Sequence, residues 1–268
     1  MNKKEILVIN GGGPLKGEVC ISGAKNSALP ILAACVLGTE EIILDGVPAL
    51  KDVEIMIEVL KHLGSKVEYI DDETLRIDSS GINTCETPFE LMDKMRASFV
   101  VMGPLLSRFK EAHTKAPGGC NIGARPIDLH LKGFEALGAN NEVNDDAISI
   151  TTDGELIGNE IYLDFPSVGA TQNIIMAATL AKGETIIENA AKEPEIVDLA
   201  SFLSKMGANI KGAGTSTIVI QGVEKLTGTR HTIIPDRIEA ASYMLAAVMT
   251  KGDVTIKNVI GSHIRPVI

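Results

Sequence analysis

The chain has 268 residues, 45% of them hydrophobic, which is enough apolar material for one large domain or two ordinary ones and excludes a disordered chain. Its 25 basic and 35 acidic residues give a net charge of −10, so we exclude a general nucleic-acid or anionic-membrane surface and expect an anionic ligand to meet a local basic cluster. No run is long enough to span a bilayer, and the apolar stretch 6–9 is too short for a signal peptide, so we expect a cytoplasmic protein. The cysteines lack the spacing of a disulfide scaffold or a zinc site and are expected to be free thiols: Cys20, Cys35, Cys85 and Cys120.

One pattern of predicted elements recurs along the chain. A helix rich in alanine and methionine, then a turn and a β-branched strand, are predicted at 28–37 with 41–44, 170–181 with 184–188, and 240–249 with 253–257. An amphipathic helix that ends in an apolar residue and a glycine, followed by two short strands, is predicted at 53–64, 129–138 and 196–207. The final glycines, Gly64, Gly138 and Gly207, are 74 and 69 residues apart. We therefore predict repeat units at 27–96, 98–168 and 170–239, with buried apolar helices wrapped by sheets.

The turns and the less regular parts of this pattern add further expectations. Gly183 and Gly252 follow the apolar helices and are expected to take the left-handed conformation of a helix C-terminus. In the second unit, the helix predicted at 98–108 leads to a strand that runs into a glycine-rich stretch. A fourth unit begins at Ala240 and stops inside its amphipathic helix, so we expect poor order beyond about Asp236 or self-association. Three apolar residues of this unit are expected to lack partners: Met244, Leu245 and Val248.

Two clusters hold the residues best suited to chemistry. The stretch 22–27 precedes the first apolar helix and places Lys25 at a helix N-terminus, which favours anions; the alternative is a capped helix with a solvated lysine. The stretch 117–128 combines three glycines with Cys120 and Arg125. It is either a loop whose amides and arginine lower the pKa of the thiol, or a glycine loop with an incidental cysteine.

Other candidates are weaker. Arg96 begins the second apolar helix, where the helix dipole disfavours a cation unless an anion is near; a surface ion pair is the alternative. Ser167 precedes another apolar helix and either binds a polar ligand together with the Gly169 amide or simply caps the helix. The segment 235–239 is expected to hold a domain junction together. The histidines show no catalytic or metal-binding arrangement and are assigned surface or helix-face roles: His62, His113, His130, His231 and His263.

Five motifs taken together closely resemble the UDP-N-acetylglucosamine 1-carboxyvinyltransferase family of enolpyruvyl transferases. They are SGAKN at 22–26, MRAS at 95–98, PGGCNIGARPIDLH at 117–130, SVGAT at 167–171 and PDRIE at 235–239. The resemblance covers the whole chain and implies the enolpyruvyl transferase fold, an α/β (α+β) architecture in which each of two domains is an inside-out barrel of three units. It implies a first domain at 25–234 and a partial second domain at 1–24 and 235–268, with the active site between the domains.

The resemblance also implies the reaction, in which the enolpyruvyl group of phosphoenolpyruvate moves to the 3-hydroxyl of UDP-N-acetylglucosamine and phosphate is released. This is the first committed step of peptidoglycan synthesis, and it connects the chain to cell wall biogenesis, cell shape and cell division. Lys25 and Cys120 would be catalytic, with Cys120 as the proton donor to the methylene carbon, the site of a pyruvate adduct and the target of fosfomycin. Phosphoenolpyruvate would be bound by Lys25, Asn26, Arg96 and Arg125. UDP-N-acetylglucosamine would be bound by Arg96, Arg125, Pro126, Ile127, Asp128, Leu129, Ser167, Val168 and Gly169. No metal is implied, and no cofactor beyond the co-substrate phosphoenolpyruvate.

Two departures from the family and two alternatives remain. Phe165 stands where some relatives carry a lysine, so a diphosphate contact from that side chain is absent. The family's second domain continues beyond residue 268 and carries an aspartate expected to take the hydroxyl proton and further arginines, so we expect weak nucleotide binding and little turnover. A 5-enolpyruvylshikimate 3-phosphate synthase-like enzyme is the first alternative, against which the Cys120 loop argues. A non-catalytic binding module, paired with a second chain, is the other.

Overall fold

The computed structural model describes residues 6–92, 95–115, 127–144 and 147–268. The chain forms two compact units, of which Gly23–Ile234 is the larger, while Met1–Ser22 and Pro235–Ile268 together form the smaller. The sequence predicts domain boundaries at 24/25 and 234/235. None of the helices in the described ranges is long and apolar enough to cross a membrane.

Largely buried helices form the centre of the larger unit. They are α1 (Lys25–Ala34) with the 3₁₀ helix η1 (Cys35–Leu37), η2 (Arg96–Val101) leading into α4 (Met102–Phe109), and α6 (Val168–Ala178). Every residue of α1 from Ser27 onward is buried, as is every residue of α6 from Ala170 onward. These elements confirm the predicted apolar helices, except that the second one opens with the 3₁₀ turns of η2.

Amphipathic helices lie beside this core and end as the sequence predicts. They are α2 (Lys51–Leu63), α5 (Asp128–Ala136) and α7 (Pro194–Lys205), and each buries its apolar side. The glycines that follow have φ values of 110° at Gly64, 93° at Gly138 and 109° at Gly207. Because side chains rarely adopt this left-handed conformation, glycine ends each helix at low cost.

The prediction for the two other turns is half right. Gly183 is left-handed, with a φ of 92°. In the second turn Lys251 takes the positive φ instead, at 50°, so the prediction for Gly252 is wrong. Gly252 is needed for space, because an added Cβ would lie 2.3 Å from the carbonyl oxygen of Leu15.

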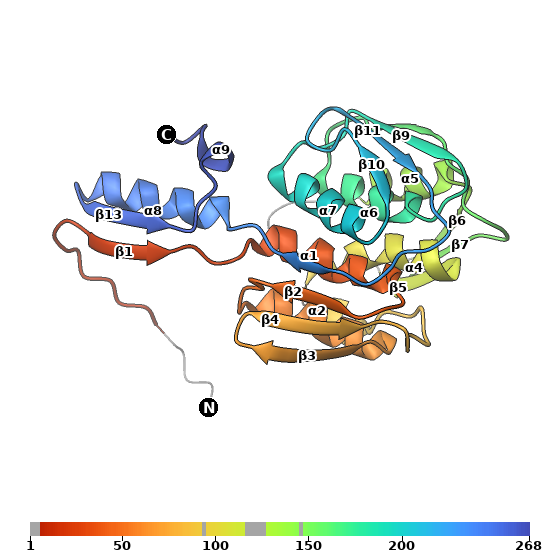
Figure 1. Cartoon of the computed structure of the whole chain (residues 1–268), viewed down its shortest axis with the longest axis horizontal. Coiled ribbons are helices and arrows are strands. Elements are labelled where there is room, and N and C mark those ends of the chain that lie inside the picture. The colour runs from red at the N-terminus through yellow and green to blue at the C-terminus, as the bar shows by residue number, and fades with distance from the viewer. Residues whose placement is uncertain (1–5, 93–94, 116–126, 145–146) are drawn as a thin grey trace. The chain divides into compact units, whose positions relative to one another are not determined.

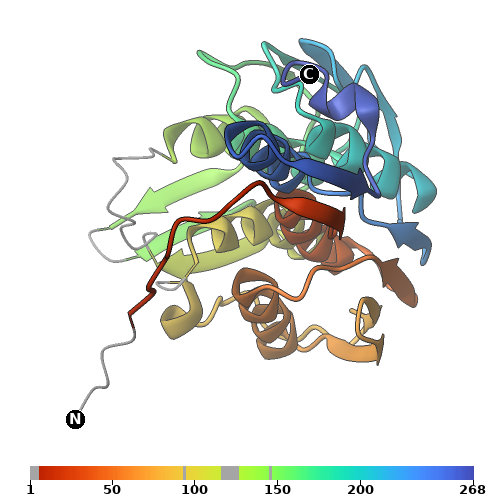
Figure 2. The ribbon, with the colours of Figure 1, turned by 90° about the vertical axis from the view of Figure 1, so that its left-hand side faces the viewer.

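Sheets cover the outside of the central helices (Figures 1 and 2). In the described part of the larger unit the first sheet has the order β12-β2-β4-β3, formed by β12 (Arg230–Thr232), β2 (Ile42–Asp45), β4 (Thr74–Asp78) and β3 (Lys66–Asp71). The second has the order β5-β7-β6, formed by β5 (Glu111–Lys115), β7 (Ala147–Thr151) and β6 (Asn140–Val143). The third has the order β10-β11-β9-β8, formed by β10 (Asn209–Lys211), β11 (Thr217–Gln221), β9 (Glu184–Glu188) and β8 (Glu160–Tyr162). A short helix, α3 (Phe89–Met92), precedes η2.

Each sheet is joined to the preceding repeat, two of them through a whole strand and the third through a single β-bridge. β8 pairs in parallel with β9, and a parallel bridge joins Glu86 to His113 in β5. β12, at the end of the third repeat, pairs in parallel with β2 of the first, with Arg230 opposite Ile43. The three repeats therefore close into a ring, which is the inside-out barrel that the resemblance implies.

The smaller unit combines the two ends of the chain. β1 (Lys16–Cys20) pairs in parallel with β13 (Asp253–Lys257), and the two lie side by side in Figures 1 and 2. α8 (Arg237–Met249) and α9 (Gly261–Ile264) pack there around Ile21, Ala240 and Ile264. Met244 contacts this cluster, contrary to the prediction that it lacks a partner, whereas Leu245 is 56% and Val248 77% exposed. Self-association through α8 stays a prediction.

Two glycines let neighbouring helices approach α6 closely. A Cβ added to Gly103 of α4 would lie 2.4 Å from the backbone oxygen of Asn173, and one added to Gly133 of α5 would lie 2.4 Å from the side chain of Ile174. The backbone at Gly103 has nowhere to move, because the surrounding residues of α4 are buried. Close helix packing therefore depends on the missing side chain.

We expect Gly103→Ala to lower the free energy of unfolding by about 1–3 kcal/mol, because the added methyl group overpacks the contact between α4 and α6. Urea titration followed by circular dichroism measures this. Gly154→Ala is the matched control, since a Cβ there has no neighbour within 4 Å. Equal midpoints for both variants would contradict the prediction.

Candidate active site

The first candidate cluster lies at the start of α1. Lys25 is the first residue of the helix, and the N-cap residue Ala24 offers no side-chain hydrogen bond. The Lys25 ammonium pairs with the Asp52 carboxylate in the first turn of α2, at 3.0 Å from Nζ to Oδ2. Both side chains are more than a third exposed, so this pair contributes only ~0–1 kcal/mol. The capped helix that the sequence allows as an alternative is absent here, and the lysine is ion-paired rather than free.

Two backbone features shape the same turn. Gly23 lies so close to the chain at Gly46 that a Cβ would be 1.9 Å from the Gly46 carbonyl oxygen, which explains the glycine in this motif. Pro30 lies inside α1 and has no N–H, so it cannot donate the helical hydrogen bond to the carbonyl of Asn26. Asn26 itself is exposed.

The starts of α5 and α6 lie together and bring six of the candidate nucleotide-binding residues into one place. They are Ile127, Asp128 and Leu129 at the start of α5, and Ser167, Val168 and Gly169 at the start of α6. A Cβ at Gly169 would lie 3.2 Å from the ring of His130, which fixes how closely the two turns approach. The Ser167 hydroxyl accepts a hydrogen bond from the Ala170 N–H at 3.3 Å, so this serine caps α6. Two helix N-termini side by side produce a positive potential, although the exposed Asp128 carboxylate partly offsets it.

A buried amide joins these turns to η2. The Asn173 amide donates to the carbonyl of Phe99 at 3.0 Å and to Nδ1 of His130 at 2.8 Å, while its oxygen accepts from the Gly103 N–H at 2.9 Å. The ring of Phe99 also meets that of His130 edge-on. One side chain of α6 therefore holds the start of α5 and the helix η2, which begins at Arg96, to the same core.

His130 lies on α5, in agreement with the helix-face role predicted for it, and takes part in a hydrogen-bond network. Burial lowers its pKa to about 4, so the imidazole is neutral near pH 7. Nδ1 accepts from Asn173, which puts the proton on Nε2, beside Gly169. His231 contradicts the prediction of surface or helix-face roles for the histidines, because it is buried in β12. A polar pair inside an apolar stretch, Gln172 and Asn173, was the available signal for such a network.

Several predicted site residues lie outside the described ranges. Cys120, Arg125 and Pro126 fall between residues 115 and 127, and Arg96 is placed only by its backbone, as the first residue of η2. Their grouping with Lys25 into a cationic site stays a prediction.

The three cysteines in the described parts are free thiols. Burial raises the pKa of Cys35, and burial together with the nearby Glu111 carboxylate raises that of Cys85 to about 11. Cys20 is exposed on β1. In the described ranges no group of three or more His, Cys, Asp or Glu side chains could hold a metal ion.

The motif at 235–239 joins two segments of the smaller unit, and its predicted role at a domain junction stays a prediction. Asp236 caps α8 by accepting from the N–H groups of Ile238 and Glu239. Glu239 accepts from both the N–H and the hydroxyl of Ser22, at 3.0 and 2.6 Å. The Asp236 N–H donates to the Ser22 carbonyl at 2.9 Å.

The ring of three repeats is similar to the fold of the enolpyruvyl transferases. The crystal structure of the enolpyruvyl transferase NikO from Streptomyces tendae matches with a TM-score of 0.77 and 25% identity, over 88% of this chain and 56% of that one. EPSP synthase from Acinetobacter baumannii matches with a TM-score of 0.75 and 20% identity, over 93% of this chain and 57% of that one. The family model for EPSP synthase (3-phosphoshikimate 1-carboxyvinyltransferase) covers residues 9–268, and the chain belongs to this family.

Curated relatives are more similar. UDP-N-acetylglucosamine 1-carboxyvinyltransferase of Finegoldia magna is 66% identical over 264 residues, which are 98% of this chain and 62% of that protein. UDP-N-acetylglucosamine 1-carboxyvinyltransferase 1 of Caldanaerobacter subterraneus subsp. tengcongensis is 57% identical over 265 residues, 99% of this chain and 63% of that protein. The resemblance drawn from the five motifs is thus confirmed, and the chain spans a little over three fifths of the length of these relatives.

The lowered pKa of His130 predicts a pH dependence of folding. In the unfolded chain a histidine takes up a proton near pH 6.5, whereas folded His130 does so only near pH 4. The unfolded state therefore binds more protons between these values, and stability falls as the pH drops from about 6.5 to about 4, by at most ~1.4 kcal/mol per pH unit. Urea midpoints at several pH values measure it. We expect His130→Gln to flatten the pH profile of stability between about pH 4 and 6.5. His62→Gln, at an exposed position, is the control and should leave the profile unchanged. Parallel profiles for His130→Gln and the wild-type chain would contradict the lowered pKa of His130.

Proposed function

We propose that this chain acts in the reaction of a UDP-N-acetylglucosamine 1-carboxyvinyltransferase. The enolpyruvyl group of phosphoenolpyruvate passes to the 3-hydroxyl of UDP-N-acetylglucosamine, and phosphate leaves. The observation that supports this most is the identity of 66% and 57% to relatives of that name over nearly the whole chain, against 20% to EPSP synthase of the same family. The smaller unit is then part of a second domain. The proposed location of the protein is the cytoplasm, where both co-substrates are available.

The phosphoenolpyruvate site is proposed to form around the start of α1. Lys25 supplies a positive charge at a helix N-terminus, where backbone N–H groups also favour an anion. Phosphate would displace the weak ion pair with Asp52 and meet Arg96 and Arg125, whose forked donors suit a phosphate better than a point charge does.

The nucleotide site is proposed to lie over the starts of α5 and α6. Support comes from the closeness of these two turns at Gly169 and His130, and from the positive ends of two helices facing the same region. The diphosphate would lie near Ser167, Val168 and Gly169, and the uridine near Arg125, Pro126, Ile127, Asp128 and Leu129.

Cys120 is proposed as the general acid. Its thiol proton goes to C3 of phosphoenolpyruvate, which makes C2 electrophilic and leaves a thiolate. The oxygen of the sugar hydroxyl then bonds to C2 while the hydroxyl proton passes to a base, the role that the family resemblance gives to an aspartate beyond residue 268. The C2–O bond to phosphate finally breaks as one proton on C3 returns to the thiolate, which restores the double bond and the thiol. A thiol suits this step because it is acidic enough to donate and, once ionised, nucleophilic enough to form the pyruvate adduct.

The choice of acceptor tests the proposed function. We expect the purified chain to bind UDP-N-acetylglucosamine and not shikimate 3-phosphate in calorimetry, and any phosphate released from phosphoenolpyruvate to depend on the sugar nucleotide. Binding of shikimate 3-phosphate alone would favour the EPSP synthase alternative. Binding of neither acceptor would contradict the proposal.

Fosfomycin tests the role of Cys120. We expect intact-mass spectrometry to show one covalent adduct on the wild-type chain and none on Cys120→Asp, because a carboxylate does not open the epoxide as a thiolate does. Cys20 is the internal control, since it is an exposed free thiol on β1. An adduct on Cys20 as fast as on Cys120 would show simple thiol exposure rather than an activated site.

A further inference from the structure

A buried carboxylate lies next to the start of α1. Asp198 belongs to α7 and is only 5% exposed. Its Oδ2 accepts from the Ser27 hydroxyl at 2.5 Å and from the Ile234 N–H at 3.3 Å, and its Oδ1 faces Nε2 of His231 at 2.9 Å. A buried charge is stable only when its oxygens are satisfied in this way.

These contacts close into a ring of hydrogen bonds around the first turn of α1. The Ala24 N–H donates to the Ile234 carbonyl at 2.8 Å, and the Ser27 N–H donates to the Ala24 carbonyl at 3.1 Å. The Ile234 N–H and the Ser27 hydroxyl both end on Asp198. The two residues enclosed by this ring along the chain are Lys25 and Asn26.

The far side of the carboxylate is held by a histidine with a defined proton position. Nδ1 of His231 lies 3.1 Å from Nζ of Lys205, and an ammonium group can only donate, so Nδ1 accepts. The proton of the neutral ring is therefore on Nε2 and points to Asp198. One imidazole ring thus links Lys205 to Asp198.

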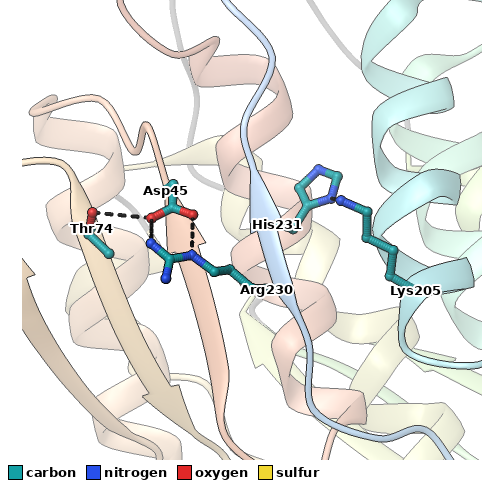
Figure 3. Close-up of polar contacts among 5 residues, drawn as sticks. All are labelled: Asp45, Thr74, Lys205, Arg230 and His231. Atoms are coloured by element: carbon teal, nitrogen blue, oxygen red, sulfur yellow. Dashed lines mark hydrogen bonds and ion pairs between the residues drawn. The ribbon is translucent and has the colours of Figure 1, made fainter.

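β12 is fixed on its other side by a separate ion pair. Figure 3 shows Arg230 and His231 on opposite sides of this strand, with Asp45 facing the first and Lys205 the second. Arg230 binds both carboxylate oxygens of Asp45 at 2.8 Å, and Thr74 adds a longer contact of 3.4 Å. The Asp45 pair therefore offers a control that disturbs β12 without touching the ring around α1.

We propose that Asp198 is a positioning residue for the phosphoenolpyruvate site, holding the first turn of α1 so that Lys25 and Asn26 face the phosphate correctly; this rests on the proposed function. The turn has little else to hold it. α1 has no side-chain cap, Pro30 removes one helical hydrogen bond at Asn26, and the pair of Lys25 with Asp52 is weak. A displacement of about 1 Å in such a turn is enough to impair binding and reaction strongly.

The proton arrangement makes Asp198→Asn a sharp variant. If the new amide oxygen keeps the contacts with Ser27 and Ile234, the amide nitrogen faces the Nε2–H of His231, and two donors oppose each other. His231 cannot move its proton to Nδ1, because Lys205 donates there. We expect Lys205→Gln to relieve this block. The amide oxygen of the new glutamine can accept a hydrogen bond from a protonated Nδ1 of His231, and Nε2 of His231 is then free to accept a hydrogen bond from the amide at position 198.

Hydrogen exchange tests the ring without any ligand. In Asp198→Asn we expect the amides of Ser27 and Ala28, which bond to the Ala24 carbonyl, to exchange about tenfold faster. The Leu131 amide in the first turn of α5 should not change. The double variant Asp198→Asn, Lys205→Gln should return most of the protection. Unchanged exchange in α1, or an equal rise in α5, would overturn the proposal.

Ligand binding tests the consequence. In calorimetry we expect Asp198→Asn to weaken phosphoenolpyruvate binding about tenfold, to leave UDP-N-acetylglucosamine binding within about twofold, and to be rescued by Lys205→Gln. Asp45→Asn is the control and should leave both affinities unchanged. Equal weakening of both ligands would overturn the positioning role and show a general structural one.

The outcomes separate this inference from the proposed function. Failure of the wild-type chain to bind phosphoenolpyruvate contradicts the proposed function. In that case the exchange rates of the Ser27 and Ala28 amides still show whether Asp198 holds the first turn of α1. Normal wild-type binding with an unaffected Asp198→Asn variant overturns only the inference. If Asp198→Asn does not fold, Ser27→Ala removes a single hydrogen bond of the ring and must still raise exchange in the first turn of α1.

Discussion

A helix without a polar face has to be covered on every side, and this constraint determines the architecture of the larger unit. α1 and α6 are such helices, so neither can lie on the surface as an amphipathic helix does. Coverage comes from the amphipathic helices and from sheets that are joined to the preceding repeat. The pairing of β12 with β2 is the last step of this coverage, because it joins the third repeat to the first.

The same constraint governs two polar groups of the central helices, whereas the buried Gln172 amide nitrogen has no hydrogen-bond partner in the described part of the chain. A hydroxyl or amide buried without a partner costs free energy, typically about 1–3 kcal/mol. Ser27 in α1 is therefore matched by Asp198 from α7, and Asn173 in α6 by groups from η2, α4 and α5. Ser27 lies in the first turn of α1, close to Lys25, and Asn173, at the middle of α6, is hydrogen-bonded to His130, which follows Leu129. The core and the candidate site are thus held by the same hydrogen bonds.

Local patterns in the sequence were sufficient for the elements and for part of the site. The apolar and amphipathic helices follow from periodicity, the glycines at 64, 138 and 207 from their spacing, and Lys25 from its place before an apolar run. What failed depends on contacts between distant residues. Ser27 and Asp198 are 171 positions apart, and nothing in either segment indicates the other. His231 looks like any polar residue of a short edge strand until α7 packs against it. The sequence predicts a left-handed conformation for Gly252, whereas the glycine is needed for space beside Leu15, which comes from the other end of the chain.

The difference between the two helix starts also has a physical meaning. α6 begins in the ordinary way, with the Ser167 hydroxyl occupying a backbone N–H of its first turn. α1 has no such cap, carries no acidic residue in its first turn, and begins with a lysine, whose charge is unfavourable at the positive end of a helix. The half-exposed Asp52 carboxylate offsets only part of this. Local rules of helix stability are therefore broken at one place, while a buried ring of hydrogen bonds around Asp198 holds that place rigid. Such a combination is expected where a protein keeps a positive site ready for an anionic ligand, because the ligand supplies the missing negative charge when it binds.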